Sequence, residues 1–194
     1  MYIVLEGIDG SGKSTHAKIL ADSLGAVHVV EPSDFAIGKL IRERIREGQV
    51  EPAVMTRLFA ADRHDLAAKV IEPALEQGQV VVSDRNVISS LVYQADGDMT
   101  VEAVWDINMK AGSLPTPDLV VVIDVPVVEA ARRLKTGREQ VDAFETDARL
   151  TKHYGRYRKL GEFVRWPVVY VDGTADLATV AERVRTAVDA VLDR

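Results

Sequence analysis

Five short apolar runs alternate along this chain with longer stretches of helical periodicity, and this alternation limits the possible folds more than any other feature. The runs cover residues 2–5, 27–30, 80–82, 119–123 and 168–171. Their nearly continuous valine and isoleucine content is typical of strands buried on both faces of a sheet. Strand–helix–strand order makes such strands parallel and places the crossover helices on both faces. We therefore predict one α/β domain, residues 1–194, in which ligands bind at the carboxyl ends of five parallel strands.

The expected helices lie between and after these strands. They cover residues 13–24, 37–47, 54–77, 101–111 and 127–134, a stretch after Phe144, and residues 177–192. Pro73 is expected to bend the longest of them, because proline lacks the backbone N–H that continues a helix.

Composition excludes several classes of function. The 194 residues contain no cysteine, so disulfides, thiol catalysis and cysteine-ligated metals are excluded. With 24 basic and 30 acidic residues, the net charge of -6 gives no overall positive field for nucleic acid or an acidic membrane. No apolar run approaches the roughly 20 residues of a membrane span, and the N-terminus does not resemble a signal peptide. We expect a cytoplasmic protein that contacts neither nucleic acid nor membrane.

Residues 7–14, Gly-Ile-Asp-Gly-Ser-Gly-Lys-Ser, match the pattern G-x-x-x-x-G-K-S between the first predicted strand and the first predicted helix. This pattern is a P-loop, whose glycines turn successive N–H groups toward phosphates at the positive end of a helix. Lys13 is expected to reach the β- and γ-phosphates of a nucleoside triphosphate, and Ser14 to ligate Mg²⁺. The candidate ATP-binding residues are Gly7, Ile8, Asp9, Gly10, Ser11, Gly12, Lys13, Ser14 and Thr15.

A P-loop is compatible with a small-molecule kinase, a GTPase switch or a regulatory ATPase module. A GTPase normally has Asp-x-x-Gly at a strand end, but Asp84 and Asp124 are followed three residues later by valines, and the chain contains no Asn-Lys pair. A regulatory ATPase usually needs more chain for its partner surfaces. A kinase therefore fits 194 residues best.

Asp84 and Arg85 follow the third apolar run and should lie beside the P-loop if that strand neighbours the first. Asp84 could hold Mg²⁺ and Arg85 could bind a substrate phosphate with two N–H groups. A solvated ion pair at a strand end is the alternative. His16, His28, His64 and His153 have no metal-ligand spacing and are expected to be structural histidines.

Together these motifs resemble the thymidylate kinases, most closely their archaeal and bacterial branch, over nearly the whole chain. The motifs are residues 5–15, Glu31-Pro32-Ser33-Asp34, residues 37–42, 58–63 and 71–75, Asp84-Arg85, residues 89–94, Pro117-Asp118-Leu119 and Asp124-Val125-Pro126. The resemblance implies a P-loop NTPase three-layer sandwich of the nucleoside monophosphate kinase type.

The resemblance also implies roles for individual residues. Phe59 would stack on thymine and Arg63, four residues later on the same helix face, would hydrogen-bond its carbonyl edge. Tyr93 would crowd the 2′ position of the sugar, and Gln94 would face base or sugar. Core packing of Phe59 and Tyr93, and a surface ion pair of Arg63 with a nearby carboxylate, remain the alternatives. The implied substrate-binding set is Asp9, Glu31, Phe59, Arg63, Arg85, Tyr93 and Gln94.

A lid is expected at about residues 135–143, a polar segment between two helices. The P-loop contains no arginine after Asp9, so Arg138, helped by Arg133 or Lys135, is expected to meet the charge of the transferring group. The expected catalytic residues are Lys13, Asp84, Arg85 and Arg138. Val30, Asn86 and Ala143 depart from the family's usual residues, which leaves the preference for the acceptor nucleotide open.

The reaction implied by the resemblance moves the γ-phosphoryl of Mg-ATP to dTMP. The accepting phosphate is already anionic, so positioning and charge neutralisation should suffice without a strong general base. One alternative is a deoxynucleoside kinase, which would need Glu31 or Asp84 as base. Another monophosphate kinase, or a regulatory ATPase, remains open too. The resemblance suggests a homodimer.

Overall fold

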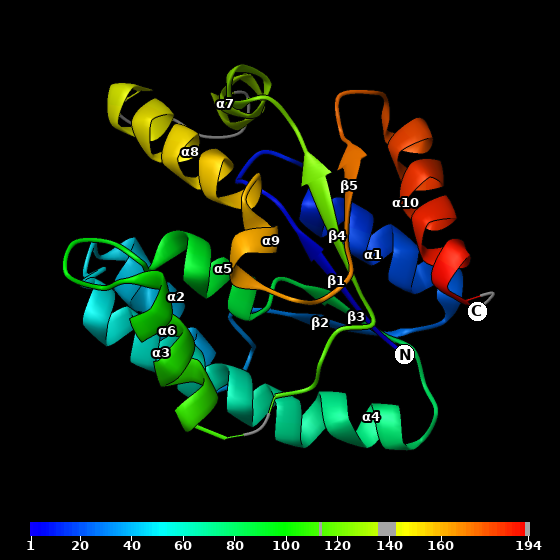
Figure 1. Ribbon diagram of the computed structural model, residues 1–194, viewed down its shortest axis with the longest axis horizontal. Helices are drawn as coiled ribbons and strands as arrows, with labels where there is room; N and C mark the ends of the chain where they lie inside the picture. The colour runs from blue at the N-terminus through cyan, green and yellow to red at the C-terminus, as the bar shows by residue number, and fades with distance from the viewer. Residues whose placement is uncertain (113, 136–142, 193–194) are drawn as a thin grey trace.

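A sheet of five parallel strands forms the centre of the computed structural model, which describes residues 1–112, 114–135 and 143–192 (Figure 1). The strands are β1 (Tyr2–Glu6), β2 (Val27–Val30), β3 (Val81–Asp84), β4 (Leu119–Asp124) and β5 (Val168–Asp172). Their order across the sheet is β2-β3-β1-β4-β5. The predicted α/β fold with a five-stranded parallel sheet is therefore confirmed.

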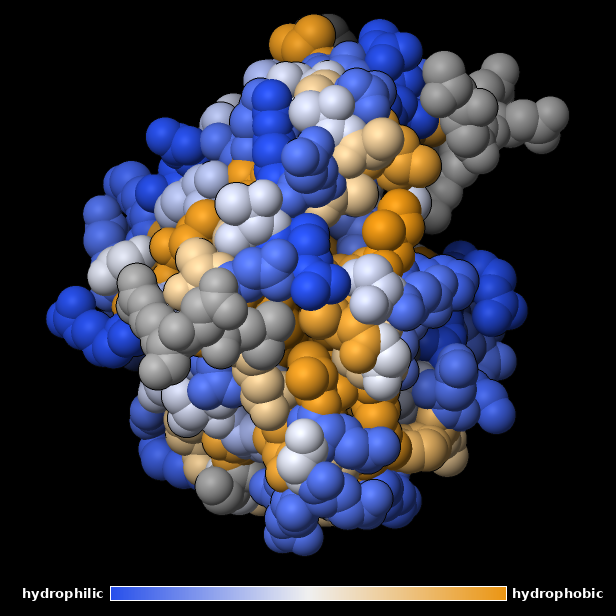
Figure 2. Space-filling view, turned by 90° about the vertical axis from the view of Figure 1, so that its right-hand side faces the viewer, coloured by the Kyte–Doolittle hydropathy of each residue, from blue (hydrophilic) through white to orange (hydrophobic). Residues whose placement is uncertain are grey.

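Helices cover both faces of this sheet. They are α1 (Lys13–Leu24), α2 (Ala36–Arg46), α3 (Pro52–Leu66), α4 (Glu72–Glu76), α5 (Val87–Tyr93), α6 (Val101–Lys110), α7 (Val127–Lys135), α8 (Ala143–Tyr157), α9 (Leu160–Phe163) and α10 (Leu177–Leu192). On one face α1 contacts β1, β2 and β3, and α10 contacts β4 and β5. On the other side α5 packs against α3, α6 and α8 (Figure 1). Seen from the α10 side, apolar surface forms a band between charged flanks (Figure 2).

The core lies where the central strands meet these helices. Ile3, Val4 and Leu5 of β1 have no exposed surface, and the same apolar cluster includes Ile88 and Leu91 of α5. Each fully buried aliphatic side chain contributes roughly 1.5–3 kcal/mol relative to an exposed one. This rigid packing fixes the carboxyl ends of β1 and β3, where the chemistry was predicted.

Parallel pairing places β3 directly beside β1, with Leu5 in register with Asp84. The expectation that Asp84 lies beside the P-loop is therefore correct. The strand is shifted relative to its prediction, because it begins at Val81 and extends to Asp84 itself.

The expectation that all five strands are buried on both faces is wrong for β2 and β5. Both are edge strands, and Val30, Val169 and Tyr170 are 42%, 37% and 38% exposed. An apolar run reports residue type but not the position of a strand in the sheet, so edge and centre are indistinguishable in this pattern.

The long helix predicted from Val54 to Gln77 is divided by a π-helical turn at Ala67–Ile71, between α3 and α4. The irregularity precedes Pro73, because the proline ring would clash with the carbonyl of the residue four positions earlier. Helical periodicity alone missed α5 and α9, which have only 7 and 4 residues. The family resemblance did predict a helix after Arg85. No helix in the described ranges is long and apolar enough to cross a membrane.

Candidate active site

The P-loop joins β1 to α1, and its backbone explains its glycines. Gly7 has φ 146°, and a Cβ there would lie 2.7 Å from Ser11 Oγ and 2.8 Å from the carbonyl oxygen of Ile123 in β4. Gly12 has φ 93° and directly precedes α1. A side chain at Gly7 would therefore push the loop away from the sheet, so the close packing requires glycine.

Lys13 is the first residue of α1 and is only 4% exposed. Its Nζ lies 3.3 Å from Asp9 Oδ1. Burial and the nearby Arg85 lower the pKa of Lys13, while Asp9 opposes that shift. Ser14 and Thr15, in the same first turn, are exposed. The loop thus presents one buried ammonium group and two accessible hydroxyls.

Arg85 follows β3 with φ 78°, a left-handed conformation that is uncommon outside glycine. Its N–H donates to the carbonyl of Leu5 (3.0 Å), and its own carbonyl accepts from Ser83 Oγ (2.6 Å). Such a backbone costs about 1–3 kcal/mol and persists only where the surroundings enforce it. The neighbouring strands therefore hold this arginine in place before any substrate arrives.

The guanidinium of Arg85 meets three partners. Nη2 donates to Asp9 Oδ1 at 2.6 Å, Nη1 donates to Ser89 Oγ at 3.1 Å, and the Tyr93 ring centroid lies 5.1 Å from Cζ. Burial by itself would raise the pKa of Asp9, but Lys13 and Arg85 hold it well below its usual range. Asp9 is therefore a carboxylate shared by the two cations that were predicted to bind phosphate.

Asp84 is 3% exposed, and its Oδ1 has no hydrogen-bond partner within the described chain. A buried carboxylate oxygen without a partner is unfavourable unless a cation or donor approaches it. Among the described residues no group of three or more histidine, aspartate or glutamate side chains could hold a metal. Mg²⁺ is usually held by one or two carboxylates together with substrate phosphates. Asp84 and the exposed hydroxyl of Ser14 fit that donor set.

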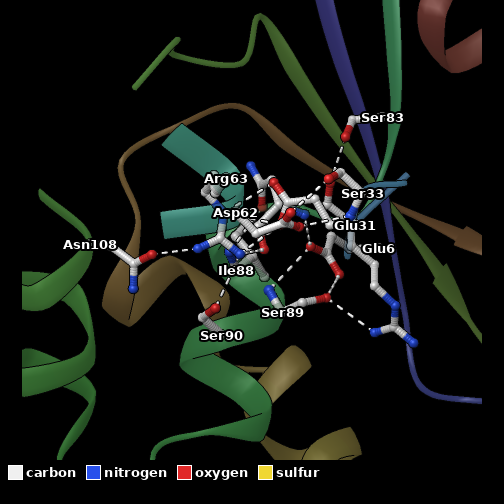
Figure 3. A network of polar contacts seen from close by, with 12 residues as sticks. Glu6, Glu31, Ser33, Asp62, Arg63, Ser83, Ile88, Ser89, Ser90 and Asn108 are labelled. Carbon is white, nitrogen blue, oxygen red and sulfur yellow. Dashed lines mark hydrogen bonds and ion pairs between the residues drawn. The ribbon is translucent and has the colours of Figure 1, made fainter. Parts of the chain in front are cut away.

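A second polar cluster connects Arg63 of α3 with Glu31, the residue after β2 (Figure 3). Arg63 is 3% exposed, and its Nη2 lies 2.6 Å from Glu31 Oε2. Its Nε also donates to both Glu31 oxygens, at 3.1 and 3.0 Å. The remaining contacts go to Asn108 Oδ1, the carbonyl of Asn86 and Ser90 Oγ.

The alternative in which Arg63 forms a surface ion pair with Asp62 or Glu72 is wrong. Asp62 instead accepts from the N–H and the hydroxyl of Ser33, at 2.7 and 2.6 Å. Arg63 is a buried residue with internal partners, because the helix turns this face toward β2 and α5. Its predicted contact with thymine stays a prediction.

Three of the expected nucleotide-binding side chains lie around this region. Phe59, one turn before Arg63, is half-buried and is not among the residues of the apolar core. Gln94 ends α5, is 8% exposed, and has an Oε1 without a partner in the described chain. The Tyr93 ring packs on His153 at a centroid distance of 4.2 Å. Burial lowers the pKa of His153 to about 4, so this ring is a neutral packing partner near neutral pH.

Arg138 lies outside the described residues, as does the segment 136–142 that forms most of the expected lid. Lys135 and Ala143, at its ends, belong to α7 and α8. Arg133 contacts the P-loop itself. Its Nη1 donates to the carbonyl of Ser11 (3.3 Å) and its Nη2 to the carbonyl of Gly173 (3.0 Å), which joins the loop after β5 to the P-loop.

Sequence reasoning missed Glu6 as a site residue. Glu6 ends β1, has no exposed surface, and accepts hydrogen bonds from Ser89 and from Tyr157 of α8. One signal was available, because Glu6 is an acid that ends an otherwise apolar strand directly before the P-loop. Nothing in the local sequence indicated Tyr157, whose partner lies 151 residues away.

The fold and this geometry define a class. A P-loop lysine, a strand-terminal aspartate and a fixed arginine converge at the carboxyl ends of β1 and β3, which is the arrangement of a P-loop nucleotide kinase.

Comparison with known proteins identifies the family within this class. The family model of thymidylate kinase matches residues 5–184. The chain is 41% identical over 177 positions to a probable thymidylate kinase of Thermococcus gammatolerans, covering 84% of this chain and 83% of the relative. It is 35% identical over 209 positions to that of Thermococcus kodakarensis, covering 99% and 98%. A probable thymidylate kinase of Pyrobaculum calidifontis is 41% identical over 147 positions, covering 75% and 74%. The chain belongs to the thymidylate kinase family.

Proposed function

We propose that the protein transfers the γ-phosphoryl group of Mg-ATP to the 5′-phosphate of dTMP, giving dTDP and ADP. The observation that carries this proposal is the meeting of Lys13 and Arg85 on Asp9. One cation belongs to the loop that binds triphosphate, and the other stands at the start of α5, beside the elements with the predicted thymine contacts. Two anionic phosphates brought together there would face both cations.

Positioning and charge neutralisation provide the chemistry. Lys13 would bind the phosphates of ATP and Arg85 would bridge the donor and acceptor phosphates, while the preset backbone of Arg85 avoids reorganisation during transfer. Ser14 and Asp84 would hold Mg²⁺, which when bound neutralises phosphate charge. The predicted lid, with Arg138, would exclude water, because water competes with dTMP for the phosphoryl group.

A deoxynucleoside kinase is less well supported by the geometry. Its neutral hydroxyl acceptor needs a carboxylate base. Glu31 is 3% exposed and already accepts three contacts from Arg63, so it is poorly placed for that role. Asp84 is better used for Mg²⁺. Full-length identity to probable thymidylate kinases also disfavours a regulatory ATPase.

The direct test is release of ADP from Mg-ATP, measured against dTMP, dUMP, dCMP, UMP, AMP and thymidine. The proposal requires the highest kcat/KM with dTMP. Preference for thymidine would support the deoxynucleoside kinase, and ADP release unaffected by every acceptor would support an ATPase. Replacing Mg²⁺ with EDTA should stop the reaction.

We further propose that the whole chain forms a single kinase domain that works in the cytoplasm as a homodimer, without nucleic acid or membrane. Leu40 and Ile45 of α2 are 41% and 48% exposed, and a second copy could cover them. Light scattering after size exclusion would test the dimer.

Replacing Phe59 with alanine should weaken dTMP binding by roughly 1–3 kcal/mol, the scale of base stacking on an aromatic ring. The melting temperature should change little, because Phe59 lies outside the apolar core. Calorimetry and thermal unfolding measure the two effects. Phe35, which does pack against the core, gives the control, since Phe35→Ala should lower stability more than affinity. The reverse pattern would assign Phe59 to packing.

Tyr93→Ala should narrow the preference for dTMP over its ribonucleotide, because it removes the ring proposed to exclude a 2′-hydroxyl. Tyr93→Phe retains the ring and should retain the preference. The ratio of kcat/KM values for the two nucleotides is the measurement. Equal ratios in the alanine variant and the parent would contradict the role of Tyr93.

A further inference from the structure

Glu6 occupies a position that the phosphate-binding roles above leave unexplained. Its carboxylate is completely buried at the end of β1, yet four donors point at it (Figure 3). The backbone N–H groups of Asn86 and Ser89 donate at 3.0 and 3.2 Å, Ser89 Oγ at 2.8 Å and the Tyr157 hydroxyl at 2.7 Å. A buried carboxylate that accepts several hydrogen bonds is far better stabilised than an isolated one.

Ser89 connects this carboxylate to Arg85. Its hydroxyl has one hydrogen, which it donates to Glu6, and its oxygen accepts from Arg85 Nη1 at 3.1 Å. Glu6 therefore fixes the direction of the Ser89 hydroxyl, so that a lone pair faces Arg85. Asp9 holds the other guanidinium nitrogen, Nη2. The plane of the guanidinium is thus set from two sides, by Asp9 directly and by Glu6 through Ser89.

Tyr157 connects the same carboxylate to α8, the helix that follows residues 136–142. The ring is 2% exposed, so it has almost no surface with which to touch a substrate. Its hydroxyl reaches Glu6 Oε2, the oxygen that also accepts from Ser89. Any change at this phenol must therefore reach the phosphate site through Glu6.

We propose that Glu6 is a positioning residue for Arg85, and that the hydrogen bond from Tyr157 connects α8 to the orientation of that arginine. The inference rests on the proposed function of Arg85 in binding dTMP phosphate. Loss of the phenol hydroxyl would leave Glu6 with one donor fewer and let Ser89 reorient. The Arg85 guanidinium would then lose one of its two fixed hydrogen bonds.

The experiment compares Tyr157→Phe with Tyr170→Phe. The Tyr170 hydroxyl donates to the backbone carbonyl of Tyr157 at 2.7 Å, so both variants remove one phenol hydrogen bond from the same part of the fold. Only Tyr157→Phe affects Glu6. We expect it to lower kcat/KM for dTMP about tenfold, because small errors in positioning have large effects on rate, with KM for Mg-ATP nearly unchanged. Tyr170→Phe should leave kcat/KM within twofold of the parent, even if both variants lose similar thermal stability.

A double-mutant cycle shows whether the effect acts through Arg85. In an Arg85→Lys background, which retains a cation without the two-pronged geometry, Tyr157→Phe should change kcat/KM for dTMP by less than twofold. An equal loss in both backgrounds would overturn the inference, as would parental kinetics in Tyr157→Phe. Glu6→Gln should reduce activity more than Tyr157→Phe, provided that it folds. A parent protein that does not phosphorylate dTMP would instead refute the proposed function.

Discussion

Lys13→Ala is expected to lower phosphoryl transfer at least about a hundredfold while dTMP binding persists. Removal of a single preorganised donor to developing transition-state charge costs on this order. The P-loop contains no arginine after Asp9, and Lys13 is its buried cation. Asp9 would still be paired with Arg85 at 2.6 Å, so the acceptor side of the site should keep its geometry.

Lys18→Ala provides the matched control for this change. Lys18 lies on the same helix, and its partner Asp22 is four residues away, as Asp9 is from Lys13. The Lys18 side chain is 67% exposed, whereas that of Lys13 is 5% exposed. Exposed pairs of this kind contribute little, so Lys18→Ala should have parental activity. ADP release measures turnover and calorimetry measures dTMP affinity. Loss of dTMP binding with turnover retained would show that the P-loop assignment is wrong.

The position of the phosphate-binding residues could be predicted because each depends on local sequence. The P-loop requires its glycines through backbone angles, and the apolar run before Asp84 indicated a strand that ends at the ligand-binding edge. These features involve residues that are near one another in the chain. The adjacency of β3 and β1 was stated as a condition, and the sheet order satisfies it.

The partners of buried polar groups could not be predicted in the same way. Arg63 pairs with Glu31, 32 residues earlier, and Tyr157 reaches Glu6 across 151 residues. A helical pattern shows which residues share a face, but not which charge from another element meets that face. The sequence therefore identified Arg63 as a site residue but suggested the wrong partner for the ion-pair alternative.

Arg63→Met is expected to destabilise the fold by about 3–5 kcal/mol, because it leaves the buried carboxylate of Glu31 without its cation. Burial already raises the pKa of Glu31, and Arg63 opposes that shift. Without Arg63 the folded-state pKa should rise further above the unfolded value. Such a group stabilises the fold when protonated and loses that contribution as pH rises through its folded pKa. The deficit of Arg63→Met should therefore shrink as pH falls toward the ordinary range of a glutamic acid, which denaturant unfolding across pH would measure.

The double variant Glu31→Leu/Arg63→Met separates structural stabilisation by Arg63 from substrate binding. Removing both charges avoids the unpaired carboxylate, so the double variant should be more stable than Arg63→Met alone. The recovery should be partial, since Asn108 and Ser90 also lose a donor when Arg63 is replaced. Affinity for dTMP should stay low in the double variant, because no guanidinium is left to hydrogen-bond thymine. If calorimetry shows that dTMP affinity returns together with stability, Arg63 serves the fold alone and the thymine contact belongs to another residue.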